Sequence, residues 1–156
     1  MPHIHEKIDF TVEVFIVYKD KVLLRKHDKL KIWLSVGGHI ELDEDPNEAA
    51  LREVKEEVGL DVELVGNKGE YKNDESYREL IAPRYLGRNQ YNEHHEHIAM
   101  VYFAKAKDTN ISVSYKGDRS DECVWATLED LEKMDLVNNV KFYAKEALKE
   151  LANELV

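Results

Sequence analysis

Short apolar runs divide the first two thirds of the chain into strands. Phe10 to Tyr18 is rich in β-branched and aromatic residues, Lys19 to Lys21 has the composition of a turn, and the apolar run resumes over 22–24. This pattern predicts a β-hairpin. Similar runs predict further strands over 32–36, 62–65, 79–86, 98–104 and 122–126. The segment from Glu70 to Glu96 is the least regular, being both polar and aromatic.

One helix is marked at both of its ends. Asp45 has the side chain of an N-cap, Pro46 follows at the first helical position, and Glu48 stands at the third. Gly59 can adopt the left-handed conformation that commonly ends a helix. We therefore predict a helix from Pro46 to about Val58.

Helical spacing returns at the end of the chain. The sequence predicts a short helix capped by Thr127 and then a closing amphipathic helix. The apolar face of that last helix comprises Val140, Ala144, Ala147, Leu148, Leu151 and Leu155. No repeat, low-complexity tract or linker divides the chain, so we predict one domain over residues 1–156.

The composition is typical of a water-soluble, cytoplasmic domain. Hydrophobic residues make up 43% and charged residues 35%, and no segment approaches the roughly 20 apolar residues of a membrane span. The first nine residues have the pattern of neither a signal peptide nor a transit peptide. The lone cysteine, Cys123, agrees with a reducing compartment, and we interpret it as a packing residue because no base partner is apparent.

The formal charge of −10 disfavours an extended nucleic-acid surface, because such surfaces neutralise phosphates with clustered Lys and Arg. A small polyanionic substrate would need a local basic patch or a bound divalent cation to offset repulsion.

Three carboxylates share one face of the predicted central helix. Glu53, Glu56 and Glu57 project within an arc of about 100°, because positions i, i+3 and i+4 lie together on a helix. Like charges at this spacing are unfavourable unless a hard cation such as Mg²⁺ or Mn²⁺ binds them. Taken alone, the group is also typical of a solvated acidic helix face.

The surrounding residues narrow this choice. They follow G-x5-E-x7-R-E-U-x-E-E-x-G-U, with U aliphatic, at every fixed position. The matching residues are Gly38, Glu44, Arg52, Glu53, Val54, Glu56, Glu57, Gly59 and Leu60. The pattern resembles the Nudix box, and a chance match in such a chain is on the order of one in ten million. Val36 departs from the proline that many members of this family have before the glycine pair.

The resemblance implies a fold and an activity. It implies an α/β (α+β) protein, an αβα sandwich with a mixed β-sheet. It also implies a Mg²⁺- or Mn²⁺-dependent hydrolase that cleaves the pyrophosphate bond of a nucleoside diphosphate linked to another moiety, as NTP and dNTP pyrophosphatases do. Dinucleoside polyphosphates and ADP-sugars are alternative substrates, and members of the family often form homodimers.

The resemblance also implies residue roles. Glu53, Glu56 and Glu57 would bind the metal, with a backbone carbonyl at Gly38 or its neighbour Gly37 as a further ligand. Arg52 would orient the carboxylates. Glu44 is similar to the residue that supports this arginine through a salt bridge.

Three carboxylates are candidates for the general base. Glu56 is the first choice, and Glu93 and Glu96, on a later loop, are the alternatives.

Aromatic and basic residues after the box are candidates for substrate recognition. Rings can stack on a base and arginines can pair with phosphate, which favours Tyr77, Arg78, Arg84 and Tyr85 as substrate-binding residues. The alternative is that they are ordinary core and surface residues. Tyr77 lies 17 residues after Leu60, a spacing similar to that of dinucleoside polyphosphate hydrolases.

The sequence also suggests three other interpretations. A catalytically silent nucleotide-binding module would usually lack box carboxylates, and all are present. An isomerase on this fold would need a cysteine acid in the cleft, whereas Cys123 lies in another region. His94 and His97, or His95 and His97, could form a separate metal site, although a polar loop is the commoner meaning of such a run.

Overall fold

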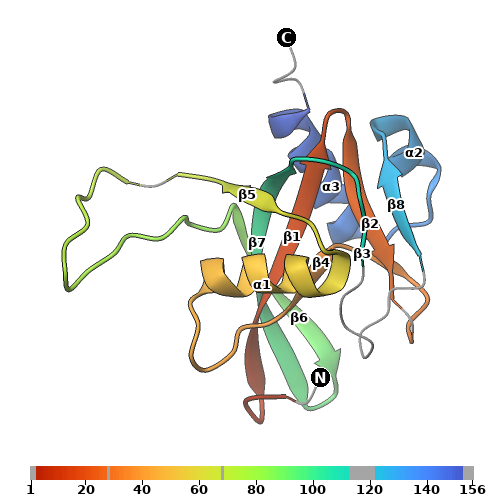
Figure 1. Cartoon of the computed structure of the whole chain (residues 1–156). Coiled ribbons are helices and arrows are strands. Elements are labelled where there is room, and N and C mark those ends of the chain that lie inside the picture. Colours follow the sequence, from red (N-terminus) through yellow and green to blue (C-terminus); the bar gives the residue numbers. More distant parts are fainter. Residues whose placement is uncertain (1–2, 28, 68, 113–121, 153–156) are drawn as a thin grey trace.

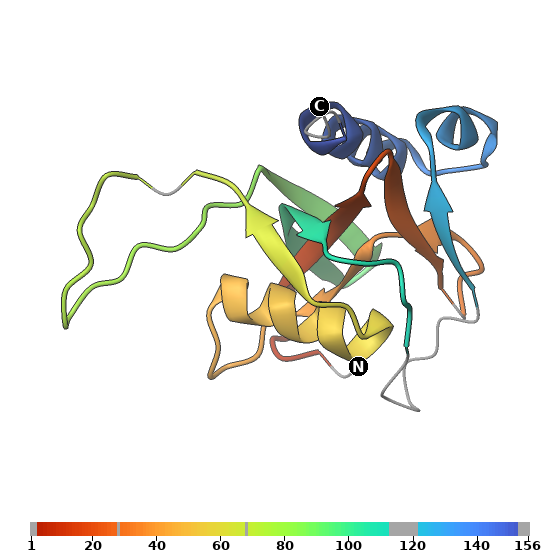
Figure 2. The ribbon, with the colours of Figure 1, turned by 45° about the horizontal axis from the view of Figure 1, so that its top comes forward.

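The computed structural model describes residues 3–27, 29–67, 69–112 and 122–152. In this part of the chain, one mixed sheet lies between α1 on one face and α2 and α3 on the other (Figures 1 and 2). The strands are β1 Ile8–Tyr18, β2 Lys21–Lys26, β3 Trp33–Leu34, β4 Val36–His39, β5 Val62–Val65, β6 Tyr85–Asn92, β7 His95–Ala106 and β8 Cys123–Ala126. The helices are α1 Pro46–Val58, α2 Leu128–Lys133 and α3 Asn138–Leu151. The expected α+β class and mixed sheet are confirmed.

The long strands β1 and β7 form the parallel centre of the sheet. Their register runs from Ile8 opposite Glu96 to Val17 opposite Lys105. Each changes its outer neighbour along its length, because β1 pairs with β4 and then β2, and β7 pairs with β6 and then β5, all antiparallel. This arrangement places β4, which carries the glycine pair, directly beside the first half of β1.

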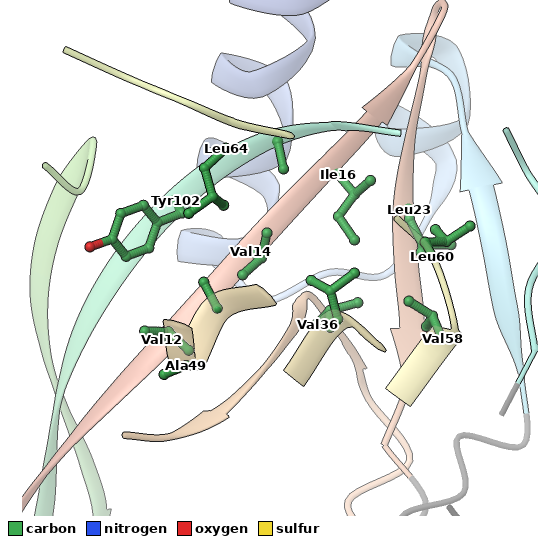
Figure 3. Packing of buried hydrophobic residues seen from close by; sticks show 13 residues of the cluster. Val12, Val14, Ile16, Leu23, Val36, Ala49, Val58, Leu60, Leu64 and Tyr102 are labelled. Atoms are coloured by element: carbon green, nitrogen blue, oxygen red, sulfur yellow. The ribbon is translucent and has the colours of Figure 1, made fainter. Parts of the chain in front are cut away.

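Two apolar layers cover the sheet. Val12, Val14 and Ile16 face α1, and Figure 3 shows these side chains converging from β1 with those of neighbouring elements. The alternate residues, Phe15 and Val17, face α3 in a second cluster. On the α1 side Cys123 is partly buried and packs against the first cluster, as expected for a packing residue.

The ends of α1 agree with the sequence prediction. The Asp45 side chain accepts a hydrogen bond from the Glu48 backbone, and the Glu48 side chain accepts one from the Asp45 backbone. These reciprocal bonds satisfy donors that a helix start leaves unpaired. Gly59 ends the helix at φ 70°, a left-handed conformation that favours glycine.

The other predicted elements are confirmed with shifted boundaries. The hairpin forms from β1 and β2, while the strand expected over 32–36 is split into β3 and β4. The later strands at 62–65, 98–104 and 122–126 are present as β5, β7 and β8, with β7 beginning three residues early. The helices capped by Thr127 and ending the chain are present as α2 and α3. Leu155 lies outside the described residues.

The strand predicted over 79–86 is wrong. Residues 79–84 lie outside the strands, and the first backbone bond to β7 is the one that the Arg84 amide donates to the Val101 carbonyl. The strand that follows is β6, over Tyr85–Asn92. The Ile81 amide donates to the Asn47 side chain of α1 and is therefore not available to a sheet, and the same side chain donates to the Ile81 carbonyl. Pro83 also lacks a backbone N–H to donate. Conversely, β6 is polar because it is paired on one side and largely exposed.

Within the described part of the chain, the helices are too short and too polar to cross a membrane.

Candidate active site

Arg52 is the centre of a hydrogen-bond network beside α1. Its Nε and Nη2 atoms donate to the two oxygens of Glu44, at 2.9 and 2.6 Å. Nη2 also donates to the carbonyl of His39 at 3.0 Å. Nη1 donates to Glu53 at 3.0 Å and to Glu56 at 3.2 Å. One guanidinium thus joins the loop before α1, the end of β4 and two carboxylates of the helix.

This network fixes the charge of its members. The Arg52 hydrogen bonds hold the pKa of Glu44 below its usual value, and Glu44 in turn raises the pKa of Arg52. The planar fork of an arginine suits such two-oxygen pairing, which a lysine cannot reproduce. The side chain of Arg52 is therefore a rigid support for the carboxylates next to it.

Glu57 is held from two other elements. The Gly37 amide of β4 donates to its Oε1 at 3.0 Å, and Arg25 of β2 forms an ion pair with its Oε2. Sequence reasoning missed Arg25. A signal was present, because Arg25 lies two residues after Leu23, which faces α1, and so occupies a core-facing position in the strand alternation.

Gly38 lies directly against Glu53. A Cβ at this position would be 2.3 Å from Oε1 of Glu53, closer than any side chain can approach. Glycine therefore allows the carboxylate to rest on the backbone of β4. The box glycine and the first box glutamate of the helix are joined by this packing.

Burial separates the three box glutamates. Glu53 and Glu57 are 3% and 2% exposed, whereas the Glu56 side chain is 47% exposed. Burial raises the pKa of Glu53 to about 7, against the opposing effect of Arg52, and its carboxyl contacts that of Glu57. Glu53 and Glu57 are therefore both buried, whereas Glu56 lies at the surface.

The donor set fits a hard divalent cation. The network holds the carboxylates of Glu44, Glu53, Glu56 and Glu57 but the guanidinium groups only of Arg25 and Arg52, so two negative charges are in excess when all are ionised. All the donor atoms of these carboxylates are oxygens, the type that Mg²⁺ and Mn²⁺ prefer.

Tyr77 and Arg78 lie on the long segment after β5, which extends away from the sheet (Figures 1 and 2). Tyr77 is 59% exposed, and its ring meets that of Tyr71 at 4.9 Å between centroids. Arg78 pairs with Asp45, the N-cap of α1, at 3.2 Å. It helps to line a pocket of about 240 Å³ beside the start of this helix.

Arg84 and Tyr85 are placed elsewhere. Arg84 pairs with Glu150 of α3 at 3.1 Å. Tyr85 packs with the α3 residues Phe142 and Tyr143, at ring distances of 6.0 and 4.9 Å, and belongs to the core cluster on the α3 face. The four predicted substrate-binding residues are therefore not gathered in one place.

The later carboxylates and histidines lie around the β6–β7 turn. Glu93 is almost fully exposed, while Glu96 accepts two hydrogen bonds from Arg88, at 2.6 and 2.8 Å, which lower its pKa. His94 is exposed in the turn, whereas His95 is buried and His97 is half-buried on β7.

Comparison with known proteins agrees with the box. The family model described as NUDIX domain matches residues 9–147. A Nudix-family hydrolase from Clostridium perfringens is 38% identical, with 92% of this chain and 97% of that chain covered and a TM-score of 0.81. A MutT Nudix hydrolase from Burkholderia pseudomallei is 21% identical, with 94% and 99% covered and a TM-score of 0.64. An ADP-ribose pyrophosphatase from Streptococcus suis is 17% identical, with 94% and 93% covered and a TM-score of 0.59. A search of curated sequences found no match. The chain belongs to the Nudix family of hydrolases.

Proposed function

We propose that this hydrolase cleaves the pyrophosphate bond of a nucleoside diphosphate linked to another moiety, with Mg²⁺ or Mn²⁺ held by Glu53, Glu56, Glu57 and the carbonyl of Gly38. The observation that carries the proposal is the packing of two buried carboxylates, Glu53 and Glu57, against each other and against the glycine pair. Arg25 and Arg52 balance only two of the four carboxylates in the network, so the arrangement is unfavourable without a further cation, because burial and like charge both oppose ionisation.

The bound metal would neutralise charge on the phosphate oxygens and lower the pKa of the attacking water. The protein supplies the positions of the ligands. Arg52 holds Glu53 and Glu56, and Arg25 with the Gly37 amide holds Glu57. Because these supports are in place before substrate arrives, the carboxylates need little reorganisation during the reaction.

Glu56 is the proposed general base. Its side chain is half exposed at the edge of the network, so it can reach water outside the fold while Arg52 limits its orientations. Glu96 is a weaker candidate because Arg88 occupies both of its oxygens. Glu93 is free to approach a bound substrate only from the β6–β7 turn.

A small nucleotide is the proposed substrate class, with nucleoside triphosphates first and dinucleoside polyphosphates or ADP-sugars as alternatives. Arg78 is a proposed contact because it pairs with Asp45 at the start of α1, the helix that carries the box glutamates. Tyr77 is proposed with it because it precedes Arg78 on the same segment and its ring is exposed. Arg84 and Tyr85 would contact a substrate only from the α3 face of the sheet. A homodimer is also proposed, on family resemblance.

A hydrolysis screen tests this function. Purified protein is assayed with a triphosphate, a dinucleoside polyphosphate and an ADP-sugar, in Mg²⁺, Mn²⁺ or EDTA, and the products are identified by chromatography. We expect cleavage that requires the metal and is lost in Glu57→Gln but kept in Glu63→Gln, an exposed glutamate of β5. Nucleotide binding without any product would favour the silent module, and cleavage that survives both EDTA and Glu57→Gln would contradict the proposal.

A further inference from the structure

A second group of ligating side chains lies at the start of β1 and β7. The parallel register sets Asp9 opposite His97, and His95 lies two residues earlier on the same strand face. Strand alternation puts all three on the face that is covered by α3 farther along the sheet. His3 completes the group from the N-terminal segment. Its members, called the His3 cluster below, are His3, Asp9, His95 and His97.

The carboxylate of Asp9 is crowded by nitrogen atoms. It is 1% exposed, and its Oδ2 lies 3.2 Å from Nδ1 of His3, from Nε2 of His39 and from Nε2 of His95. The same oxygen accepts a hydrogen bond from the Ile4 amide at 3.1 Å. One carboxylate oxygen has about two lone-pair sites, so it cannot accept from all of these nitrogens.

Several histidine ring nitrogens in and beside the cluster are also buried without a hydrogen bond. Among the described residues, Nε2 of His39, of His95 and of His97 have no hydrogen-bond partner. His95 places Nδ1 3.0 Å from the carbonyl of Glu6, an interaction in which the ring nitrogen must donate. In the neutral ring Nε2 is then an acceptor that faces the Asp9 oxygen, and two facing acceptors repel unless a cation lies between them.

We propose that the His3 cluster binds one divalent transition-metal ion of the zinc type. Its ligand atoms all lie within 4.8 Å of one another. Bonds of about 2.0–2.1 Å in a tetrahedral site require ligand separations of roughly 3.3 Å, which small side-chain movements achieve. Three imidazoles and one carboxylate suit zinc, whereas the oxygen-only box suits Mg²⁺ or Mn²⁺. The two sites therefore differ in the metal they select.

The surroundings of the cluster resemble the outer shell of a metal site. The carbonyl of Glu6 orients His95, and the His5 amide donates to Oδ1 of Asp9 at 2.6 Å. Such contacts fix the ring orientation and the basicity of ligands. Four protein ligands leave no open coordination position, so the site is structural and ties the N-terminal segment to β7. His39 connects it to the box, because its carbonyl accepts from Arg52.

Metal reconstitution tests this proposal without using catalytic activity. Tag-free protein is stripped with a chelator and reloaded with Zn²⁺ or Co²⁺, and bound metal is measured by elemental analysis and by the visible absorption of tetrahedral Co²⁺. We expect one zinc per chain in the wild type. His95→Gln and His97→Gln should each weaken binding by about 100-fold or more, at least as much as the largest losses from outer-shell changes.

Two controls separate the His3 cluster from other sites. His94→Gln removes a 90% exposed histidine next to His95 and should bind zinc as the wild type does. Glu57→Gln disables the box and should also keep zinc, so failure of the proposed catalytic function leaves this result unaffected. If the buried variants fail to fold, His3→Gln removes a ligand at the surface of the cluster and should still abolish the Co²⁺ absorption.

Three results would overturn the proposal. The wild type could bind no more zinc than a His95→Gln/His97→Gln double variant. Zinc could be lost equally in His94→Gln, which would indicate unspecific histidine binding. It could also be lost in Glu57→Gln instead, which would assign the ion to the box.

Discussion

Arg25 of β2 forms a buried ion pair with Glu57 of α1, so a strand from the first hairpin holds a carboxylate of the box. Both side chains are largely removed from water, at 12% and 2% exposed. Removing one partner of such a pair leaves an uncompensated buried charge, which costs about 3–5 kcal/mol.

This pair predicts the behaviour of an Arg25→Met variant. Urea unfolding of the metal-free protein should show a loss of about 3–5 kcal/mol, because Glu57 loses its cation. The double variant Arg25→Met/Glu57→Gln should recover most of that loss, since no charge is then buried alone. If the double variant is no more stable than Arg25→Met, the ion pair is not the origin of the effect.

A Gly38→Ala substitution should damage catalysis through Glu53. The new Cβ would lie 2.3 Å from Oε1 of Glu53, so the carboxylate must move. A displacement of about 1 Å at a reacting centre can lower the reaction rate by about 100-fold. We therefore expect kcat/KM to fall by roughly 10- to 100-fold. Gly87→Ala is the matched control, because its Cβ would meet only the Tyr143 hydroxyl at 3.9 Å. Equal activity in the two variants would show that the contact at Gly38 is unimportant.

The raised pKa of Glu53 predicts that the stability of the metal-free protein depends on pH. The folded protein holds the proton of Glu53 up to a pKa of about 7, above the 4.5 of an unperturbed glutamate, so metal-free stability should fall as pH rises from 4.5 to 7. Glu53→Gln removes this loss. In EDTA the free energy of unfolding of Glu53→Gln should exceed that of the wild type by on the order of 1–3 kcal/mol at pH 8. At pH 4.5 the two values should differ little.

Chemical unfolding of both proteins at the two pH values measures this difference. A constant difference across the range would contradict the assigned pKa shift. Saturating Mg²⁺ at pH 8 should stabilise the wild type but not the variant, because the ion stabilises only a fold that binds it.

Arg52 should be a positioning residue and not a contributor to substrate affinity. Arg52→Ala should lower kcat by about 10- to 100-fold and change KM much less, because it releases Glu53 and Glu56. Arg52→Lys should rescue little, since a lysine cannot form the two bonds to Glu44. If Arg52→Ala keeps its activity within about twofold of the wild type, Arg52 does not position the carboxylates.

Substrate preference should depend on residues outside the box. The metal and its carboxylates recognise phosphate oxygens common to all nucleotides, whereas discrimination needs contacts with the base or the second moiety. Tyr77→Ala should lose about 1–3 kcal/mol of transition-state stabilisation for some substrates only, which changes their ranking by kcat/KM. Arg84→Ala tests the same property on the α3 face. An unchanged ranking in both variants would place specificity elsewhere.

Local sequence signals predicted much of this structure. The ends of α1 follow from Asp45, Glu48 and Gly59, whose effects act within one helical turn. The box residues that share α1 or the loop before it could therefore be placed from spacing alone. Their supports from distant strands could not, because Arg25 meets Glu57 only after β2 and α1 pack on each other.

The second group of histidines shows the same limit. His95 and His97 were visible as a pair, but Asp9 joins them only through the parallel pairing of β1 with β7, 88 residues apart at that register. Such long-range pairing leaves no periodic signal in either strand. The misplaced strand at 79–86 has a related cause, since hydrogen bonds between Ile81 and the distant Asn47 fix the conformation of Ile81.

Metal binding by the box glutamates is the most direct test of the central claim. Calorimetric titration with Mg²⁺ and Mn²⁺ is performed in a His95→Gln/His97→Gln background, which removes the His3 cluster as a competing site. The account predicts binding that is weakened by at least about tenfold in Glu53→Gln/Glu57→Gln and unchanged in Glu63→Gln. Equal binding in the box double variant and its parent would contradict the account.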